Sequence, residues 1–425
     1  MIQLSHMMSL VQARAFGALL VLGAVMSIAM LPVSAEQSHH LHPSCPTGFA
    51  NFGDSLTDTG NLVDFFPYET DAENPPYGEK FFGKPAKRFC NGRLVPDFIS
   101  LAFRKPLLEP YFSITSFNYK YGINFAVAGA TAAYSLTAQE PISVTPFQTG
   151  QFIRFQNSVN ASQKQSGCRS FNKDLPDTTR DPNLWSGWLY TIKAGGNDFL
   201  PPVEQGEPVS TVNATLVPKA VGAISSAILT LYSRGARQFQ ISLDGPSGCS
   251  SIILTYLRDS NATRDSMGCI ASVNELSQNF NMQMVAEIKL LRQKLTGAKI
   301  AYFDSYSATI ELFTNPAKYG FDPAKTKTAC CGAPGVGDFN YNPNATCGHP
   351  LLGSNNCANP DQYVYWDGMH YTEAFYRIIA NFTLNGLYTD GGINYAKFCN
   401  LDFSKWGSNV TYEEVYPQTC NNLFT

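Results

Sequence analysis

The sequence Phe49-Ala50-Asn51-Phe52-Gly53-Asp54-Ser55-Leu56-Thr57-Asp58-Thr59-Gly60-Asn61 decides the fold of this chain. Residues 47–52 are largely apolar and predict a short buried strand, which Gly53 ends. Ser55 follows in a polar turn. A turn that leads from a strand into a helix presents its side chain at the carboxyl edge of a sheet, where parallel sheets bind ligands. Ser55 is therefore a candidate nucleophile.

Two later segments have the same form, a predicted strand that ends in glycine and small or polar residues. Residues 122–132 run from apolar into small residues around Gly129, and residues 189–198 end in two glycines followed by Asn197. Small residues let a ligand approach the backbone closely, although a tightly packed joint between strand and helix has the same composition. Because the carboxyl ends of parallel strands share one edge, we expect Gly129 and Asn197 to lie near Ser55.

Strands and helices alternate along the body of the chain. Apolar runs predict strands at 47–52, 122–127, 189–194, 238–243 and 299–303, and apolar spacing of three and four residues predicts helices at 95–104, 213–234, 273–295 and 372–387. Three irregular segments separate them: a surface loop at 61–95, an exposed excursion at 157–183 and a cysteine-rich loop at 320–362. The alternation predicts a parallel sheet with helices on both faces.

Composition excludes several classes of protein. The 425 residues are 44% hydrophobic, carry a net charge of −3 and contain no block of like charge, so the core is ample and a nucleic-acid partner is not expected. Length alone allows one domain or two. No repeat or linker divides the chain, and we expect one domain over 47–390 with a tail at 391–425 packed on it.

The N-terminus has the pattern of a secretory signal. Arg14 precedes an apolar run that ends at Leu31, and Val33-Ser34-Ala35 forms a small-residue cleavage site. We predict a signal peptide over 1–35 and a flexible leader over 36–46. The alternative is an uncleaved membrane anchor, but the run is shorter than the roughly 20 residues that a membrane span needs. We expect a secreted, extracellular protein without stable membrane insertion.

Cysteines and glycosylation sequons agree with secretion. Most of the eleven cysteines should be paired in an oxidising compartment, and the odd number leaves one over. Cys399 and Cys420 are candidates to pair with each other, and four cysteines in the 320–362 loop are candidates to cross-link it. The predicted N-glycosylation sites are Asn160, Asn213, Asn261, Asn344, Asn381 and Asn409.

A serine hydroxyl needs a base, and the natural base is histidine. Of the six histidines, only His349 and His370 lie beyond the signal and leader. His370 stands just before a predicted helix, and Asp367 precedes it by three residues. At this spacing in a turn the carboxylate can hydrogen-bond one imidazole nitrogen and leave the other for Ser55. A surface Asp–His pair without function is the alternative.

The third requirement is a set of donors for the oxyanion that develops in the transition state. The candidates are the backbone N–H of Ser55, the backbone N–H of Gly129 and the side-chain amide of Asn197. Gly129 as a packing residue and Asn197 as a turn residue are the alternatives.

Four blocks of the sequence resemble the GDSL (SGNH) hydrolase family, in the family's order. They are Gly53-Asp54-Ser55-Leu56, Gly129, Gly195-Gly196-Asn197-Asp198 and Asp367-Gly368-Met369-His370. Residues 88–93, 124–131, 330–332 and 366–374 resemble segments of the plant secreted GDSL esterase/lipases. Cys90 departs from that pattern, where Ser is usual, and is either the unpaired cysteine or a partner for Cys45.

The resemblance implies a three-layer α/β/α, flavodoxin-like fold with a mainly five-stranded parallel sheet. It implies hydrolysis of carboxylic esters through an acyl-enzyme without metal or cofactor. Carried over by position, Ser55 is the nucleophile, His370 the base and Asp367 its orienting acid, and the oxyanion hole consists of Ser55, Gly129 and Asn197. A plant protein of this kind would lie in the apoplast or cell wall.

Other functions remain open at this stage. An acyltransferase would use the same triad with an alcohol in place of water, and a non-catalytic binding protein could share the scaffold. A glycosidase needs a distinctive pair of carboxylates, which the sequence does not offer. The expected partner is a small-molecule or polysaccharide ester, and the expected state is a monomer.

Overall fold

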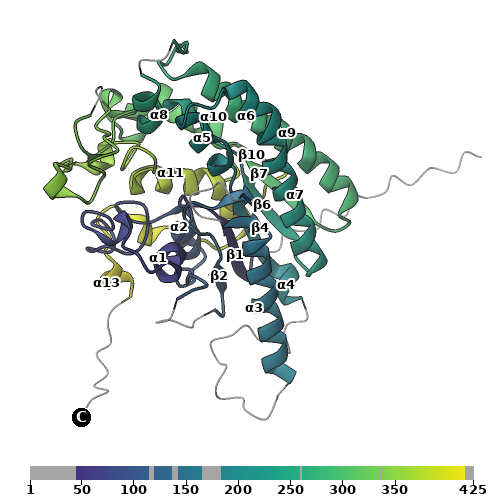
Figure 1. The fold of residues 1–425 in the computed structure, drawn as a ribbon. Coiled ribbons are helices and arrows are strands. Elements are labelled where there is room, and N and C mark those ends of the chain that lie inside the picture. The colour runs from purple at the N-terminus through teal and green to yellow at the C-terminus, as the bar shows by residue number, and fades with distance from the viewer. Residues whose placement is uncertain are drawn as a thin grey trace, which may run out of the picture. The chain divides into compact units, whose positions relative to one another are not determined.

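A six-stranded sheet forms the centre of the computed structural model, which describes residues 45–113, 119–135, 142–164, 183–258, 261–335, 337 and 339–416 (Figure 1). Its strands are β1 (Gly48–Gly53), β2 (Gly122–Asn124), β5 (Trp188–Lys193), β6 (Gln238–Ser242), β7 (Lys299–Phe303) and β10 (Thr389–Asp390). The order is β10-β7-β6-β5-β1-β2. The first five in sequence run parallel, and only β10 pairs antiparallel, with β7. The mainly five-stranded parallel sheet is confirmed.

Strand β1 lies between β2 and β5. Ala50 pairs with Ile123 of β2 and with Tyr190 of β5, and Gly53 pairs with Lys193 at the carboxyl end of β5. All six residues of β1 are buried, as expected for an inner strand covered on both faces. The register brings the chain that leaves β1 next to the chain that leaves β5.

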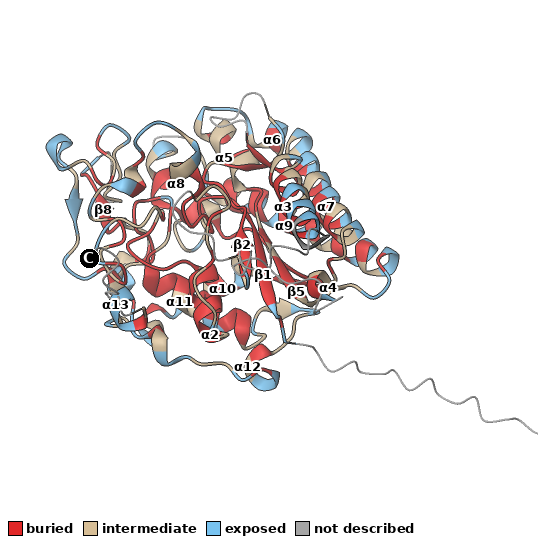
Figure 2. Cartoon of the chain, turned by 90° about the horizontal axis from the view of Figure 1, so that it is seen from below, coloured by how far each residue is buried: buried red, intermediate tan, exposed pale blue. Residues whose placement is uncertain are grey.

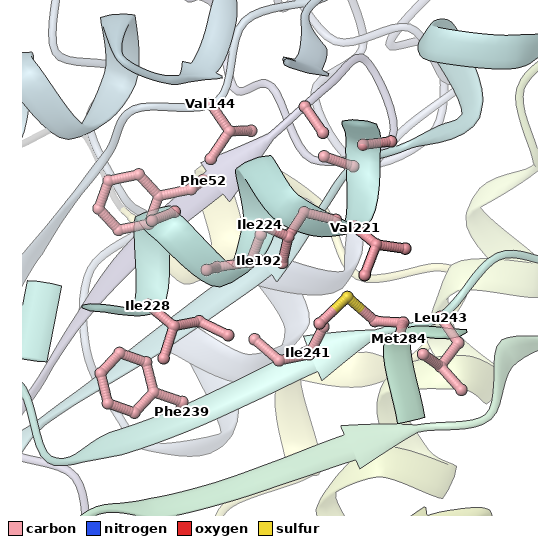
Figure 3. Close-up of a cluster of buried hydrophobic side chains, with 14 of the residues drawn as sticks. Phe52, Val144, Ile192, Val221, Ile224, Ile228, Phe239, Ile241, Leu243 and Met284 are labelled. Atoms are coloured by element: carbon pink, nitrogen blue, oxygen red, sulfur yellow. The ribbon is translucent and has the colours of Figure 1, made fainter. Parts of the chain in front are cut away.

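Helices cover both faces of the sheet and make three layers. One face packs on α3 (Phe147–Lys164), α7 (Val217–Ser233) and α9 (Ala271–Lys294), and the other on α2 (Val95–Ala102), α10 (Ser305–Thr314) and α11 (Glu373–Leu384). Side chains of β1 point into both apolar cores. Phe52 packs in the core with α3, α7 and α9 (Figure 3), and Phe49 packs in the core with α2, α10 and α11. The strands and the inner sides of the helices are buried, as Figure 2 shows.

The remaining elements are short. The helices are α1 (Asn61–Phe65), α4 (Leu184–Gly187), α5 (Gly196–Glu204), α6 (Val209–Thr215), α8 (Ser251–Tyr256), α12 (Tyr395–Phe398) and α13 (Tyr412–Val415). Single 3-10 turns span Asp71–Glu73, Ser247–Cys249, Pro316–Tyr319, Pro323–Lys325, Pro350–Leu352, Pro360–Gln362 and Ser404–Trp406. Two small sheets pair β3 (Thr131–Ala133) with β4 (Ser143–Thr145) and β8 (Cys331–Gly332) with β9 (Asn355–Asn356).

The helix predicted at 213–234 is two helices. Helix α6 ends at Thr215 and α7 begins at Val217. Pro218 stands in the first turn of α7, where its missing N–H costs no helical bond, whereas in one continuous helix it would break the ladder. Pro218 therefore explains the break between α6 and α7, and the spacing of apolar residues alone does not predict it.

The interpretation of 61–95 as a surface loop is wrong for its second half. The side chains of Arg88 and Arg93 are almost fully buried, and they form ion pairs with Asp97 and Glu373. Two of the Arg93 nitrogens also donate to backbone carbonyls of the tail. Each guanidinium makes four hydrogen bonds, to carboxylates and backbone carbonyls, which a sequence pattern does not reveal.

The other irregular segments also differ from expectation in part. Residues 157–164 continue helix α3, while the rest of the predicted excursion up to residue 182 lies outside the described residues. In the tail, Trp406 packs edge-on against Phe98, and the backbone N–H of Tyr412 donates to Phe81. The described part of the tail, up to residue 416, thus contacts the body at these residues.

Four disulfides cross-link the described chain. They join Cys45 to Cys399, Cys249 to Cys269, Cys330 to Cys357 and Cys331 to Cys347. The suggested Cys399–Cys420 bond is wrong, because Cys399 is bonded to Cys45. Cys90 is free and buried, so it does not pair with Cys45 either. The four cysteines of the 320–362 loop cross-link it as predicted.

The N-terminal predictions lie mostly outside the described residues. The signal peptide at 1–35 and the leader up to residue 44 are not described, nor are Cys168 and Cys420. Cys45, at the end of the expected leader, is fixed to the body by its disulfide. Five sequon asparagines are exposed, whereas Asn213 is half-buried.

In the part of the chain that the structure describes, one helical stretch, Val209–Ser233, has the length and apolar content of a membrane span. It corresponds to α6 and α7. One side of it, which includes Val217, Ile224 and Leu231, is buried in the core against the sheet. This pattern of burial is that of an amphipathic helix in a protein core.

Candidate active site

Ser55 lies in the turn that follows β1, as the sequence predicts. The turn is fixed at Gly53, whose N–H donates to Gln148 Oε1 at 2.9 Å and whose carbonyl accepts from Gln148 Nε2 at 2.7 Å. Gly53 has a φ of 150°, and a Cβ there would lie 2.2 Å from the carbonyl oxygen of Lys193. A glycine is therefore required for β1 to approach β5 so closely just before the nucleophile.

His370 and Asp367 meet Ser55 from the far end of the sequence. His370 Nε2 lies 2.8 Å from Ser55 Oγ, and His370 Nδ1 lies 2.7 Å from Asp367 Oδ2. Both residues stand in a tight turn in which Trp366 N–H donates to the His370 carbonyl. The three side chains form a hydrogen-bonded chain from a hydroxyl through an imidazole to a carboxylate.

The surroundings keep Asp367 ionised. Burial alone would raise the pKa of Asp367, but the charge and hydrogen bonds of His370 and the hydroxyl of Tyr77 lower it below its ordinary value. The backbone N–H of His370 donates to Asp367 Oδ1 at 2.8 Å, and the Tyr77 hydroxyl donates to Oδ2 at 2.8 Å. An ionised Asp367 holds the proton on Nδ1 of His370, which leaves Nε2 to accept the Ser55 proton.

The candidate oxyanion donors come from the two segments beside the nucleophile. Gly129 lies in a turn with a φ of 78°, anchored by the bond from Val127 N–H to the Gly53 carbonyl at 3.1 Å. Asn197 Nδ2 donates to the carbonyl of Ala130 at 3.0 Å, which ties the amide to that turn. An amide nitrogen has two hydrogens, so Asn197 keeps one for an oxyanion.

Two carboxylates, the buried Asp58 and the half-buried Asp198, support this edge. Asp58 accepts from the N–H of Ala128 at 2.8 Å and from three amides that follow it in sequence. Asp198 accepts from the N–H of Ala132 at 2.6 Å and of Ala133 at 3.0 Å. Burial raises the pKa of Asp58 to about 6 and of Asp198 to about 7, in both cases against the opposing effect of these amides.

Metal binding was not predicted from the sequence. Among the described residues, one group with potential ligand atoms in reach of one another is Cys249, Asp265 and Cys269. The two sulfurs of this group are bonded to each other in a disulfide. They are therefore not thiolates that could hold an ion.

The structure brings Ser55, Asp367 and His370 into direct contact, and Asn197 and Gly129 to the same edge of the sheet. Sequence reasoning missed Tyr77, whose only signal was its place in an aromatic-rich loop. It also missed Phe89, whose ring lies 5.1 Å from the imidazole of His370. His349, the other histidine in the body, pairs with Asp71 at 2.8 Å and takes no part in this cluster.

A three-layer α/β/α fold with a serine, histidine and aspartate at the carboxyl edge of its sheet defines a serine hydrolase site. Residues 49–382 match the family described as GDSL-like Lipase/Acylhydrolase. The chain belongs to this family and is an enzyme that hydrolyses ester bonds.

Similar proteins come mainly from plants. A GDSL esterase/lipase of Arabidopsis thaliana is 34% identical over 386 residues, which cover 88% of this chain and 91% of the relative. An esterase of Hevea brasiliensis is 36% identical, covering 76% and 81%, and alpha-L-fucosidase 3 of Arabidopsis thaliana is 32% identical, covering 86% and 97%. A phospholipase A1 of Streptomyces albidoflavus aligns over 70% of this chain and 92% of its own with 10% identity and a TM-score of 0.29.

Proposed function

We propose that this protein is a secreted serine carboxylic ester hydrolase that forms an acyl-enzyme on Ser55. The observation that carries the proposal is the 2.8 Å distance between Ser55 Oγ and His370 Nε2, with Asp367 on the opposite ring nitrogen. This contact allows the imidazole to take the hydroxyl proton as the oxygen attacks a carbonyl carbon.

The reaction runs in two halves. Ser55 Oγ attacks the ester, His370 accepts its proton, and the N–H groups of Ser55, Gly129 and Asn197 stabilise the oxyanion. The intermediate collapses, the alcohol leaves with the proton from His370, and the acyl group stays on Ser55. Water then attacks with His370 as base, and the acid is released.

The Ser55→Ala variant tests the proposal. It should lose p-nitrophenyl acetate hydrolysis by about 10⁴-fold or more, because the nucleophile acts as one unit with its base. A fluorophosphonate probe should label the native enzyme at Ser55, identified by peptide mass spectrometry, and should not label the variant. Wild-type activity in Ser55→Ala would refute the role of Ser55.

Two alternatives share this site. An acyltransferase would give a new ester when a candidate alcohol is added to the assay, so product analysis separates it from a hydrolase. A non-catalytic binding protein would not react with the fluorophosphonate. The hydrogen bond between His370 and Ser55 favours a reactive site over a non-catalytic one.

A glycosidase is a third alternative, because one relative carries the name alpha-L-fucosidase 3. Glycosidases use a pair of carboxylates on the two sides of the scissile bond. Here Asp367 accepts bonds from His370 and Tyr77, which suits an orienting group better than an acid or nucleophile. Hydrolysis of p-nitrophenyl α-L-fucoside that survives in Ser55→Ala would favour the glycosidase.

Secretion is supported by the four disulfides and the sequence pattern at 1–35. We expect glycans at the exposed sequons Asn160, Asn261, Asn344, Asn381 and Asn409 and less occupancy at half-buried Asn213. Expression in plant cells, followed by glycopeptide mass spectrometry and size-exclusion chromatography, tests secretion, glycan sites and the expected monomer together.

A further inference from the structure

A cavity extends from Ser55 under the carboxyl edge of the sheet to helices α2 and α11. Its volume is about 170 Å³. An apolar cavity of about 150 Å³ is known to hold one benzene molecule. The space beside Ser55 therefore matches one ring or a chain of similar size, and it is larger than an acetyl group requires.

The sheet contributes polar side chains to this cavity. Asn51, Thr191 and Gln240 pair in register across β1, β5 and β6, and all three line the cavity. We call them the polar row. Two positions earlier on the same strands, Phe49 and Leu189 belong to the apolar core against α2 and α11. The face of the sheet thus changes from apolar to polar where the cavity begins.

Two buried polar atoms at the cavity have no hydrogen-bond partner among the described residues. They are Thr57 Oγ1 and Gln240 Nε2. Gln240 is 5% exposed, and Thr57 is 8% exposed. A buried polar group without a partner is costly to the fold. These atoms can donate hydrogen bonds to a guest that carries an oxygen.

Another part of the cavity lining is aromatic. Tyr365, Tyr371, Phe375 and Tyr376 line it, and we call them the aromatic wall. The rings of Tyr371 and Phe375 stack with centroids 4.0 Å apart, and those of Tyr365 and Tyr371 with centroids 5.0 Å apart. Aromatic side chains pack favourably against another ring.

The charges at the cavity are few and largely neutralised. Asp244 pairs with Lys193 at 3.1 Å, and burial raises the pKa of Asp54 and that of Glu204, the latter to about 7. A carboxylate on a guest would lose its hydration without gaining an unpaired cation among the lining residues. The cavity therefore suits an uncharged group.

We infer that this cavity binds the acyl group of the substrate, and that this group is neutral, about the size of one ring, and bears a hydroxyl. The inference rests on the proposed function, since the acyl group stays on Ser55 while the alcohol leaves and water enters. A recessed cavity beside Ser55 suits the part that stays. The unpartnered amide of Gln240, in the polar row, holds the hydroxyl, and the aromatic wall contacts the ring.

Matched esters of one alcohol test this. The enzyme should hydrolyse p-nitrophenyl (4-hydroxyphenyl)acetate with a kcat/KM about tenfold above that of p-nitrophenyl phenylacetate, because unmet donors favour the hydroxylated group. It should hydrolyse p-nitrophenyl dodecanoate at least about tenfold less well than the hexanoate, because the chain exceeds the cavity. Equal rates for each pair would overturn the inference.

Substitutions at the cavity test which residue causes the preference for the hydroxylated ester. Gln240→Leu should reduce the preference for the hydroxylated ester several-fold. Gln151→Leu is the control, because Gln151 is also buried with an unpartnered amide but lies on α3 outside this cavity. An unchanged preference in Gln240→Leu, with a melting temperature like that of Gln151→Leu, would overturn the assignment.

Binding without turnover separates this inference from the catalytic one. Isothermal titration calorimetry of Ser55→Ala should show tighter binding of 4-hydroxyphenylacetamide than of phenylacetamide, by about the same tenfold factor. If this difference is found but the native enzyme hydrolyses no ester, the proposed function fails and the cavity assignment stands. If esters are hydrolysed but the amides bind equally, the cavity assignment fails alone.

Discussion

Replacing Asn197 with alanine should reduce kcat by about 10²–10³-fold. Asn197 Nδ2 donates one of its two hydrogens to the Ala130 carbonyl at 3.0 Å. Only the second hydrogen can bond the oxyanion. Loss of one such donor costs about 2.7–4 kcal/mol in the transition state, which corresponds to this range. The lost bond to Ala130 should also lower the free energy of unfolding by about 1 kcal/mol.

Steady-state hydrolysis of p-nitrophenyl acetate measures the effect, and KM should change much less than kcat, since the oxyanion forms only in the transition state. Asp198→Asn is the matched control. It weakens the adjacent anchor to Ala132 and Ala133 but leaves the Asn197 amide in place, so its kcat should fall less. A kcat in Asn197→Ala within tenfold of wild type would refute the role of this amide.

Three further predictions concern stability. Burial raises the pKa of Asp198 to about 7 from its ordinary value of 3.8, so between these pH values the folded protein keeps a proton that the unfolded chain releases. The free energy of unfolding therefore falls as the pH rises from 3.8 to 7. Melting curves across this range should show a loss of up to about 4 kcal/mol for wild type relative to Asp198→Asn. Glu373→Gln leaves Arg93 buried without its counterion and should cost about 3–5 kcal/mol in urea unfolding, far more than Glu311→Gln, whose partner Lys318 is exposed. Cys399→Ser removes the bond to the N-terminal segment and should cost about 2–5 kcal/mol, with no change in kcat.

Each of these has a result that would contradict it. If the stability of wild type and that of Asp198→Asn changed with pH in parallel, Asp198 would be ionised in the folded protein over the whole pH range. Equal losses in Glu373→Gln and Glu311→Gln would mean that burial of the first pair has no energetic effect. An unchanged melting temperature in Cys399→Ser would mean that the disulfide does not hold the folded ends together.

The sequence was sufficient where the signal is local. Apolar runs ending at Gly53 and at Gly195 located β1 and β5. Elimination among six histidines left His349 and His370, and Asp367 three residues upstream favoured His370 as the candidate base. The contact of His370 with Ser55 joins residues 315 positions apart, so the sequence alone could only propose it. The parallel sheet supplies the reason, because both chain segments reach its carboxyl edge.

The sequence was insufficient where partners are distant and polar. Tyr77 reaches Asp367 across 290 positions, and Arg93 reaches Glu373 across 280. Both residues stand in a segment rich in proline and glycine, which is typical of exposed loops. Their burial depends on hydrogen bonds made after the chain has folded, and no periodicity records such bonds.

The turn at Ser55 is held rigidly by hydrogen bonds, and the carboxylates that make these bonds lower the stability of the fold. Gly53 brings β1 against β5, while Asp58 and Asp198 accept from amides on both sides of Gly129, those of Ala128, Ala132 and Ala133. Both carboxylates have raised pKa values, so burial opposes their charge. A fold selected for stability alone would replace them with apolar groups. Their effect is to fix backbone donors before a substrate arrives, which is what stabilisation of an oxyanion requires.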